Sequence, residues 1–144
     1  MRIKRLISAG LLAAMVTMSV GTVAQAYNEN YYNEDISFNE FQGSVNTSYE
    51  NKDTSSSIYL SYNYGGSSYS NYIPFRFGTM GSVGSRGDGA IDVSNGNYYT
   101  FYPGDYTTNM YNYVNEWGYN YAAIQATNIG DSAASINITF KLDN

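Results

Sequence analysis

The residues best suited to recognition chemistry are tyrosines on two neighbouring predicted strands. Alternating segments over residues 58–64 and 69–77 together carry Tyr59, Tyr62, Tyr64, Tyr69 and Tyr72. A tyrosine offers an aromatic ring face and a hydroxyl, so a sheet surface bearing several of them can stack sugar rings or anchor a protein partner. We take these five tyrosines as candidate ligand contacts. Simple decoration of a solvent-exposed sheet face is the alternative, because Tyr also favours strands in its own right.

A second candidate is the tripeptide Arg86-Gly87-Asp88, which lies in the glycine-rich segment 78–89. Integrins recognise this tripeptide on exposed loops, and the glycines and the lack of apolar periodicity predict a mobile loop. Three residues recur often by chance, so an ordinary soluble loop is the favoured interpretation. A phosphate-binding loop is not predicted, because a strand rather than a helix is expected to follow.

Catalytic and metal-binding chemistry have few suitable residues in this chain. It has no Cys and no His, which removes thiol nucleophiles, the commonest general base and the commonest zinc ligand. Asp88, Asp92 and Asn95 come nearest to a calcium loop, but Asp92 falls in a predicted strand and no Glu completes the set. The twelve acids offer many carboxylate pairs for glycoside hydrolysis, none distinguished by its surroundings. We predict no enzyme activity, no cofactor and no metal.

The first 26 residues have the layout of a secretory signal. A basic start is followed by an apolar stretch over residues 6–23, and the small residues Ala24 and Ala26 provide a cleavage site. Cleavage there leaves 118 residues, enough for one domain, which we expect outside the cell. No later apolar run approaches the roughly 18 residues of a membrane span.

The mature chain is expected to be acidic and tyrosine-rich. Four basic residues against all twelve acids give it a net charge of −8, which disfavours binding to nucleic acid and to anionic lipid. Tyr, Asn, Ser and Gly make up 61 of its 118 residues, and the same four types dominate antibody paratopes. This composition favours strands over helices and suits a glycan or protein partner.

Alternation of apolar and polar residues predicts most of the elements that position these side chains. Residues 27–35 are polar and aperiodic and predict a flexible acidic arm, followed by one domain over 36–144. Pro74 predicts that its strand lies at a sheet edge, and Asn95-Gly96 predicts a type I′ hairpin. Strands are predicted over 36–41, 44–50, 58–64, 69–77, 90–94, 97–102, 119–128 and 135–142.

One segment has helical periodicity. Met110, Tyr113, Val114 and Trp117 fall on a single helix face, which predicts a short helix near residues 106–117 with Trp117 buried. Gly118 stands where a left-handed residue would end that helix. Together these elements predict an all-β fold, an antiparallel β-sandwich with one short helix.

Two resemblances add to this prediction. The segment from Tyr121 to Ser132 resembles the last hairpin of immunoglobulin-like and fibronectin-type sandwiches, in which a Tyr opens the penultimate strand and an Asn-x-Gly turn leads to the last. It implies an immunoglobulin-like topology with Tyr119 or Tyr121 as a corner tyrosine. The mature chain also resembles an uncharacterised group of small secreted proteins of Gram-positive bacteria, through its signal layout and its stretches 101–105 and 120–123. That resemblance implies secretion and no particular activity.

From the sequence we therefore expect a secreted, non-enzymatic binding module that acts at or near the cell surface through a face rich in Tyr, Asn and Ser. Its ligand would be a glycan or a protein. The alternative is a self-associating extracellular matrix or fibre protein, because residues 55–75 carry no charge and their strands could pair edge to edge. The net charge of −8 opposes self-association.

Overall fold

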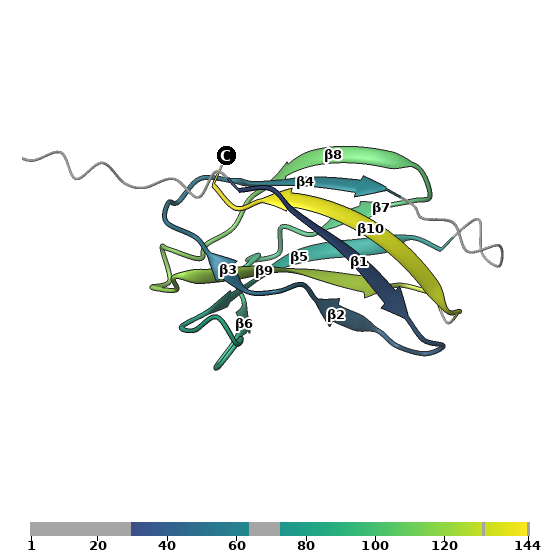
Figure 1. Cartoon of the computed structure of the whole chain (residues 1–144), viewed down its shortest axis with the longest axis horizontal. Helices are drawn as coiled ribbons and strands as arrows, with labels where there is room; N and C mark the ends of the chain where they lie inside the picture. The colour runs from purple at the N-terminus through teal and green to yellow at the C-terminus, as the bar shows by residue number, and fades with distance from the viewer. Residues whose placement is uncertain (1–29, 64–72, 131, 144) are drawn as a thin grey trace, which may run out of the picture.

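A computed structural model describes residues 30–63, 73–130 and 132–143 (Figure 1). The proposed signal with its cleavage site at Ala24 and Ala26, and the candidates Tyr64, Tyr69 and Tyr72, lie outside these residues. The described residues form strands and no helix. The strands are β1 (Tyr32–Phe38), β2 (Ser44–Asn46), β3 (Glu50–Asn51), β4 (Ile58–Asn63), β5 (Phe75–Ser82), β6 (Ile91–Asp92), β7 (Tyr99–Phe101), β8 (Asp105–Met110), β9 (Tyr121–Asn128) and β10 (Ala134–Lys141).

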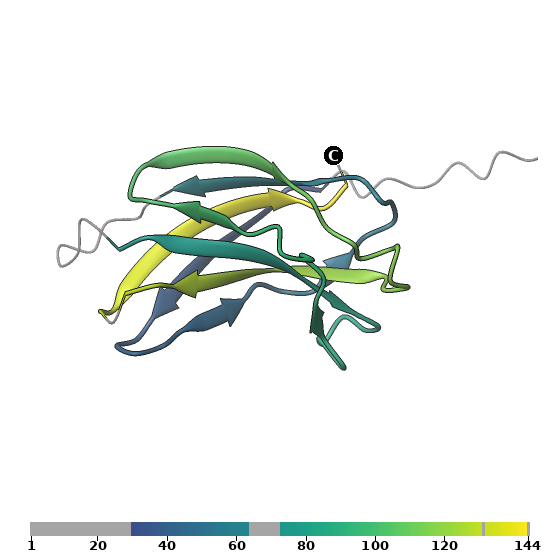
Figure 2. The same ribbon diagram turned by 180° about the vertical axis from the view of Figure 1, so that it is seen from behind.

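The strands make two antiparallel sheets that pack face to face (Figure 1 and Figure 2). Sheet A has the order β1-β10-β4-β8. Sheet B has β9 and β5 at its centre, with β2 and β3 along one side and β6 and β7 along the other. The prediction of an all-β, two-sheet fold is confirmed.

Each edge of sheet B consists of two short strands that pair one after the other with the same neighbour: β2 and β3 with β9, and β6 and β7 with β5. On β5, Met80 pairs with Asp92 and Phe77 pairs with Tyr99. The two β5 residues are three positions apart in the chain, whereas their partners on the edge are seven positions apart. Four extra residues therefore bulge out between β6 and β7. The Asn95-Gly96 turn lies in this bulge, with φ angles of 48° and 81°. The positive φ angles agree with the predicted turn, but the predicted hairpin is wrong, because the strands beside the turn pair with β5 and not with each other.

With these edges counted as single strands, the described residues form eight strands that follow the order of a jelly roll. The first, last, third and sixth form sheet A, and the second, seventh, fourth and fifth form sheet B. The predicted immunoglobulin-like hairpin is absent from this arrangement, because β9 and β10 lie in different sheets.

The prediction that Pro74 marks an edge strand is wrong. Pro74 directly precedes β5, which is a central strand of sheet B, and at this position the ladder needs no backbone N–H.

The core lies between the inner faces of the two sheets. The last strand alternates as predicted, with Ile136, Ile138 and Phe140 fully or almost fully buried. Opposite them on sheet B lie buried apolar residues of β5 and β9, among them Phe75 and Ile124. The rings of Tyr62, Phe75 and Phe77 cluster in one part of this core, with Phe101 packed against them and the partly exposed Tyr106 stacked at the outside.

The predicted helix near residues 106–117 is wrong. Residues 105–110 form β8, which pairs with β4 along its whole length, so sheet pairing overrides the helical spacing. Only one turn forms farther on, where the Trp117 N–H donates to the Tyr113 carbonyl. Gly118 is left-handed as predicted, with φ of 83°, but it ends a single turn and not a helix, and Trp117 is 45% exposed rather than buried.

Two segments that the sequence predicts to be flexible lie partly in strands. β1 begins at Tyr32, so the second half of the proposed arm 27–35 is paired with β10. The glycine-rich segment 78–89 contributes its first five residues to β5. Gly78 lies there because the Tyr98 ring covers it, and a Cβ at Gly78 would come within 3.0 Å of that ring. Close packing, rather than flexibility, accounts for this glycine.

Candidate functional site

The outer face of sheet A is polar over its whole extent. Side chains alternate along a strand, so the residues between the buried ones point to solvent. We call this surface the amide face. It comprises Tyr31, Asn33, Asp35 and Ser37 on or beside β1, Ser135, Asn137, Thr139 and Lys141 on β10, Tyr59, Ser61 and Asn63 on β4, and Asp105, Thr107 and Asn109 on β8.

Hydrogen bonds between β1 and β10 hold part of the amide face in place. The Asn33 amide donates to the Thr139 hydroxyl at 2.8 Å. The Asn137 amide donates to the side-chain Oδ1 of Asn33 at 2.9 Å and to the Asp35 carboxylate at 2.8 Å. Side chains fixed in this way lose little conformational entropy when a ligand binds.

An aromatic corner lies at the end of the amide face where β10 finishes. The rings of Tyr31 and Tyr59 meet edge to face, with centroids 6.0 Å apart and planes at 82°. The Lys141 ammonium lies 5.7 Å from the centre of the Tyr31 ring. Beside Tyr59 is an open hollow of about 360 Å³, lined also by Thr107, Thr108 and Asn109. The corner thus combines ring faces with hydroxyl and amide groups.

The five candidate tyrosines do not form one surface. Tyr59 lies on the amide face and is partly exposed. Tyr62 points inward, is fully buried and contacts Phe75 and Phe77, so it is a core residue and the expectation of a ligand contact there is wrong. Tyr64, Tyr69 and Tyr72 lie outside the described residues.

Sequence reasoning missed most of the amide face. Tyr31 and Asn33 stood in a segment predicted to be a flexible arm, and Asn137 and Thr139 lay in the predicted strand 135–142 without a functional role. The alternation of that last strand was the available signal. What the sequence did not show is which strands lie next to β10, because β1 and β4 are separated from it by about 100 and 80 positions in the chain.

The Arg86-Gly87-Asp88 loop is held against the body of the protein. Gly87 has φ of 78°, and a Cβ there would meet the Tyr49 ring at 2.6 Å. The Ser82 hydroxyl bonds to the carbonyl oxygens of Gly84 and Asp88, each at 2.9 Å. The loop is therefore anchored at its middle residue and is not a free tip, an arrangement that does not favour integrin-type recognition. Arg86 and Asp88 themselves are exposed.

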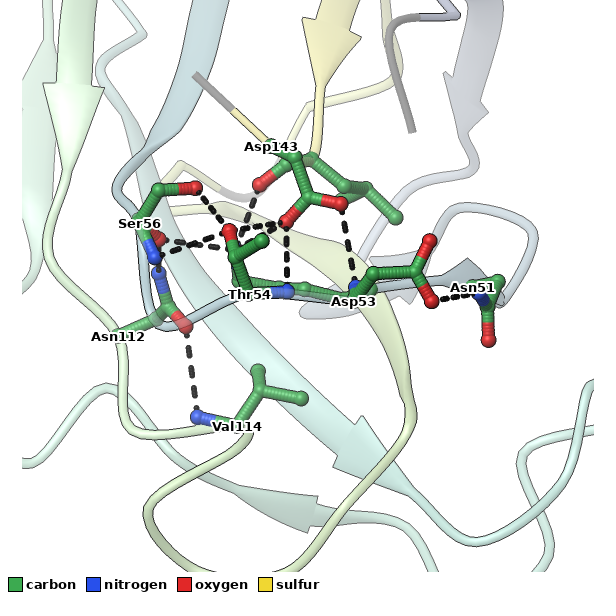
Figure 3. Close-up of polar contacts among 9 residues, drawn as sticks. Asn51, Asp53, Thr54, Ser56, Asn112, Val114 and Asp143 are labelled. Atoms are coloured by element: carbon green, nitrogen blue, oxygen red, sulfur yellow. Dashed lines mark hydrogen bonds and ion pairs between the residues drawn. The ribbon is translucent and has the colours of Figure 1, made fainter. Parts of the chain in front are cut away.

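A buried polar network fastens the C-terminal segment to the connection between β3 and β4 (Figure 3). The Lys52 ammonium lies 3.2 Å from Asp143 and also donates to the carbonyl oxygens of Ser56 at 2.8 Å and Leu142 at 2.7 Å. The Asp143 carboxylate accepts from the Thr54 hydroxyl at 2.8 Å and from the backbone N–H of Asp53 at 3.1 Å.

Burial lowers the pKa of Lys52, and attraction to Asp143 opposes that shift without cancelling it. Both side chains have their polar atoms engaged by neighbours of the same network. The pair therefore serves to hold the C-terminal segment, and its ammonium is not placed to act as a nucleophile or base toward an external ligand.

A second polar cluster lies at the bulged edge of sheet B. Tyr98 donates a hydrogen bond from its hydroxyl to Asp92, and the Ser94 N–H donates to the same carboxylate at 2.8 Å. The Arg76 guanidinium lies 5.0 Å from the centre of the Tyr98 ring. Burial acts to raise the pKa of Asp92, but the hydrogen bonds from Tyr98 and Ser94 outweigh it and lower that pKa. The cluster secures the four-residue bulge to β5.

Neither a metal centre nor a membrane-spanning helix is seen in the described part of the chain. Within residues 30–63, 73–130 and 132–143, no three acidic side chains gather as a metal site would require. Asp92, on β6, pairs with Met80 of β5, and its carboxylate accepts hydrogen bonds from Tyr98 and Ser94. In the same ranges no helix has the length and apolar character needed to cross a bilayer.

Comparison of the whole chain with protein-family models, curated proteins and solved structures found no match.

Proposed function

We propose that this chain is a secreted, non-enzymatic binding module whose amide face binds a neutral glycan at or near the cell surface. The observation that supports this most strongly is the aromatic corner: the Tyr59 ring lines a hollow together with Thr107 and Asn109, and the Tyr31 ring packs edge to face against Tyr59. Sugar rings stack on tyrosine faces, while hydroxyl and amide groups exchange hydrogen bonds with sugar hydroxyls.

The charges of the amide face favour a neutral ligand. Asp35, Asp105 and Lys141 are its only ionisable groups apart from tyrosine, and they leave it with a net charge of −1. A polyanion would gain nothing from such a surface, and an apolar peptide would find no apolar side chains there other than the two tyrosine rings. Amide and hydroxyl side chains dominate, and a polyhydroxylated ligand matches them best.

Secretion is proposed from the basic, apolar and small-residue layout of the first 26 residues. The absence of enzyme activity is proposed because the sequence lacks His and Cys, and because Lys52 is engaged by its own network. The immunoglobulin-like topology is not retained, since the strand order is that of a jelly roll.

Self-association through residues 55–75 receives less support. The described part of this charge-free segment includes β4, which has β10 on one side and β8 on the other. A strand with two partners has no free edge to offer a second copy. The segment therefore does not supply the seam that a fibre would need along β4.

Adsorption to insoluble polysaccharides tests the proposed function. The mature chain is mixed with cellulose, chitin and mannan, and the unbound fraction is measured after sedimentation of the solid. We expect retention on at least one of them and a loss of affinity of about tenfold for Tyr59→Ala. Tyr111→Ala is the matched control, because Tyr111 is 69% exposed, follows the end of β8 and does not line the hollow beside Tyr59. Retention on none of them, or equal losses for the two variants, would overturn the proposal.

A further inference from the structure

A second hollow, separate from the amide face, lies where β3 ends and β9 begins. It has a volume of about 300 Å³ and is lined by Asn51, Lys52, Asp53, Asn115, Tyr119, Asn120 and Tyr121. It shares no residue with the hollow beside Tyr59. Ligand pockets span about 300–1,000 Å³, so a hollow of this size suits a small ligand.

The backbone around this hollow is fixed on three sides. Asn51 pairs with Tyr121 in the β3–β9 ladder. The Lys52 N–H donates to the Asn120 carbonyl at 2.9 Å. The single turn that carries Asn115 is closed by two further bonds, from Gly118 to the Asn115 carbonyl and from Tyr119 to the Val114 carbonyl. The positions of the lining residues are therefore set before any ligand arrives.

Among the side chains around the hollow, Lys52 is buried, whereas Asp53 and the asparagines are partly or fully exposed. The Lys52 ammonium is directed away, into the network with Asp143 and Leu142. Figure 3 shows the Asp53 carboxylate turned away from Asp143 and toward the amide of Asn51, which donates to it. No hydrogen bond within the described part of the chain engages the side-chain amides of Asn115 and Asn120, which leaves them available.

This lining selects the chemistry of the ligand. Three amides and one carboxylate supply donors and acceptors suited to neighbouring hydroxyl groups, and two tyrosine rings supply faces for C–H contacts. An anion is disfavoured, because Asp53 lines the hollow and the one cation, Lys52, is already compensated. A divalent cation would find a single carboxylate, where calcium takes about 6–8 oxygens.

We infer that this hollow is a second saccharide site, which takes one neutral sugar residue through Asn51, Asp53, Asn115, Asn120 and the rings of Tyr119 and Tyr121. It lies on a different part of the surface from the amide face. A chain with both sites can hold two glycan segments at once, and the combined affinity for a multivalent surface then exceeds that of either site.

Proton–nitrogen correlation spectra of the mature chain test this inference directly, because asparagine side-chain amides give their own signals. The probes are methyl β-glucopyranoside, methyl α-mannopyranoside and N-acetylglucosamine, each titrated at millimolar concentrations. At least one of them is expected to shift the Asn115 and Asn120 side-chain signals in a saturable manner. Asn115→Ala and Asn120→Ala are each expected to weaken that binding about fivefold, the effect of one neutral hydrogen bond. Asn39→Ala is the control and should leave it unchanged, because Asn39 is exposed in the turn after β1 and lines neither hollow.

Three outcomes would overturn the inference: no saturable shift of these signals with any of the three sugars, equal affinities for all the variants, or the same shifts with calcium chloride alone. Failure here is distinguishable from failure of the proposed function, because the two hollows have no lining residue in common. Loss of polysaccharide adsorption in Tyr59→Ala leaves the Asn115 signals as an independent readout.

Discussion

The Lys52 ammonium and the Asp143 carboxylate meet at 3.2 Å with both side chains fully buried, although 91 positions separate them in the chain. Their partners satisfy the pair from both sides: backbone carbonyls accept from Lys52, and Thr54 and Asp53 donate to Asp143. A sheet sandwich without disulfides is thereby tied to its C-terminal segment by one ion pair and its hydrogen bonds.

Removing the anion from this pair should destabilise the protein strongly. Asp143→Ala leaves a buried ammonium uncompensated, and such a loss lowers the free energy of unfolding by about 3–5 kcal/mol. Lys52→Met should cost less, because Asp143 keeps its donors from Thr54 and Asp53. Urea unfolding of the three proteins measures both values. An Asp143→Ala effect within about 0.5 kcal/mol, as at an ordinary surface position, would contradict this account.

The Asp92–Tyr98 hydrogen bond should be visible in the acid titration. The pKa of Asp92 lies below its ordinary value of 3.8 in the folded state. Its contribution to stability is therefore complete above about pH 3.8 and is lost as the pH falls through the lower, folded pKa. Tyr98→Phe removes one of the two bonds, so the pKa of Asp92 should rise toward 3.8. Carboxyl carbon signals followed by NMR report this directly, and an unchanged titration in the variant would show that the bond does not hold Asp92.

Gly118 should be sensitive to substitution because of its backbone. Its φ of 83° lies in the left-handed region, so Gly118→Ala is expected to lower the free energy of unfolding by about 1 kcal/mol, although a Cβ there would have free space around it. Gly43→Ala is the matched control, since Gly43 is also open and its φ is not in that region. Thermal unfolding compares them, and equal effects would mean that the turn before β9 is not closed as described.

Substitution of Tyr62 should lower the stability of the protein, whereas substitution of Tyr59 should affect binding with little change in stability. Both lie on β4, but Tyr62 is fully buried against Phe75 and Phe77 while Tyr59 faces solvent. Tyr62→Ala is expected to lower the free energy of unfolding by about 3–5 kcal/mol, whereas Tyr59→Ala should change it by less than about 1 kcal/mol. Denaturant titrations give both numbers, and comparable losses would place the two side chains in similar surroundings.

Local patterns in the sequence predicted much of the sheet structure. The alternation of Ile136, Ile138 and Phe140 gave the buried side of the last strand, and Asn95-Gly96 gave a left-handed turn. These features depend on neighbours in the sequence, so a local pattern is sufficient. The helix failed for the opposite reason: residues 105–110 pair with β4, more than forty positions away, and that pairing decides their conformation.

The candidate site was less accessible to sequence reasoning than the fold. A binding face arises from side chains of β1, β10, β4 and β8, and their order depends on a jelly-roll connectivity that no local motif encodes. Tyr59 was found because it lies on a strongly alternating strand. Tyr62 was misassigned because its hydroxyl suggested a surface role, whereas the strand's period places the ring in the core.

The most direct test of the proposed glycan-binding role is to map the bound surface. Proton–nitrogen correlation spectra of the mature chain are recorded during titration with a soluble oligosaccharide of whichever polysaccharide retains it. Shift changes are predicted to concentrate on the amide face, at Tyr59, Asn109 and the Asn33–Asn137 pair, and to disappear in Tyr59→Ala. Changes concentrated instead on the outer side of sheet B, at residues such as Gln125 and Thr127, would contradict the proposed binding surface.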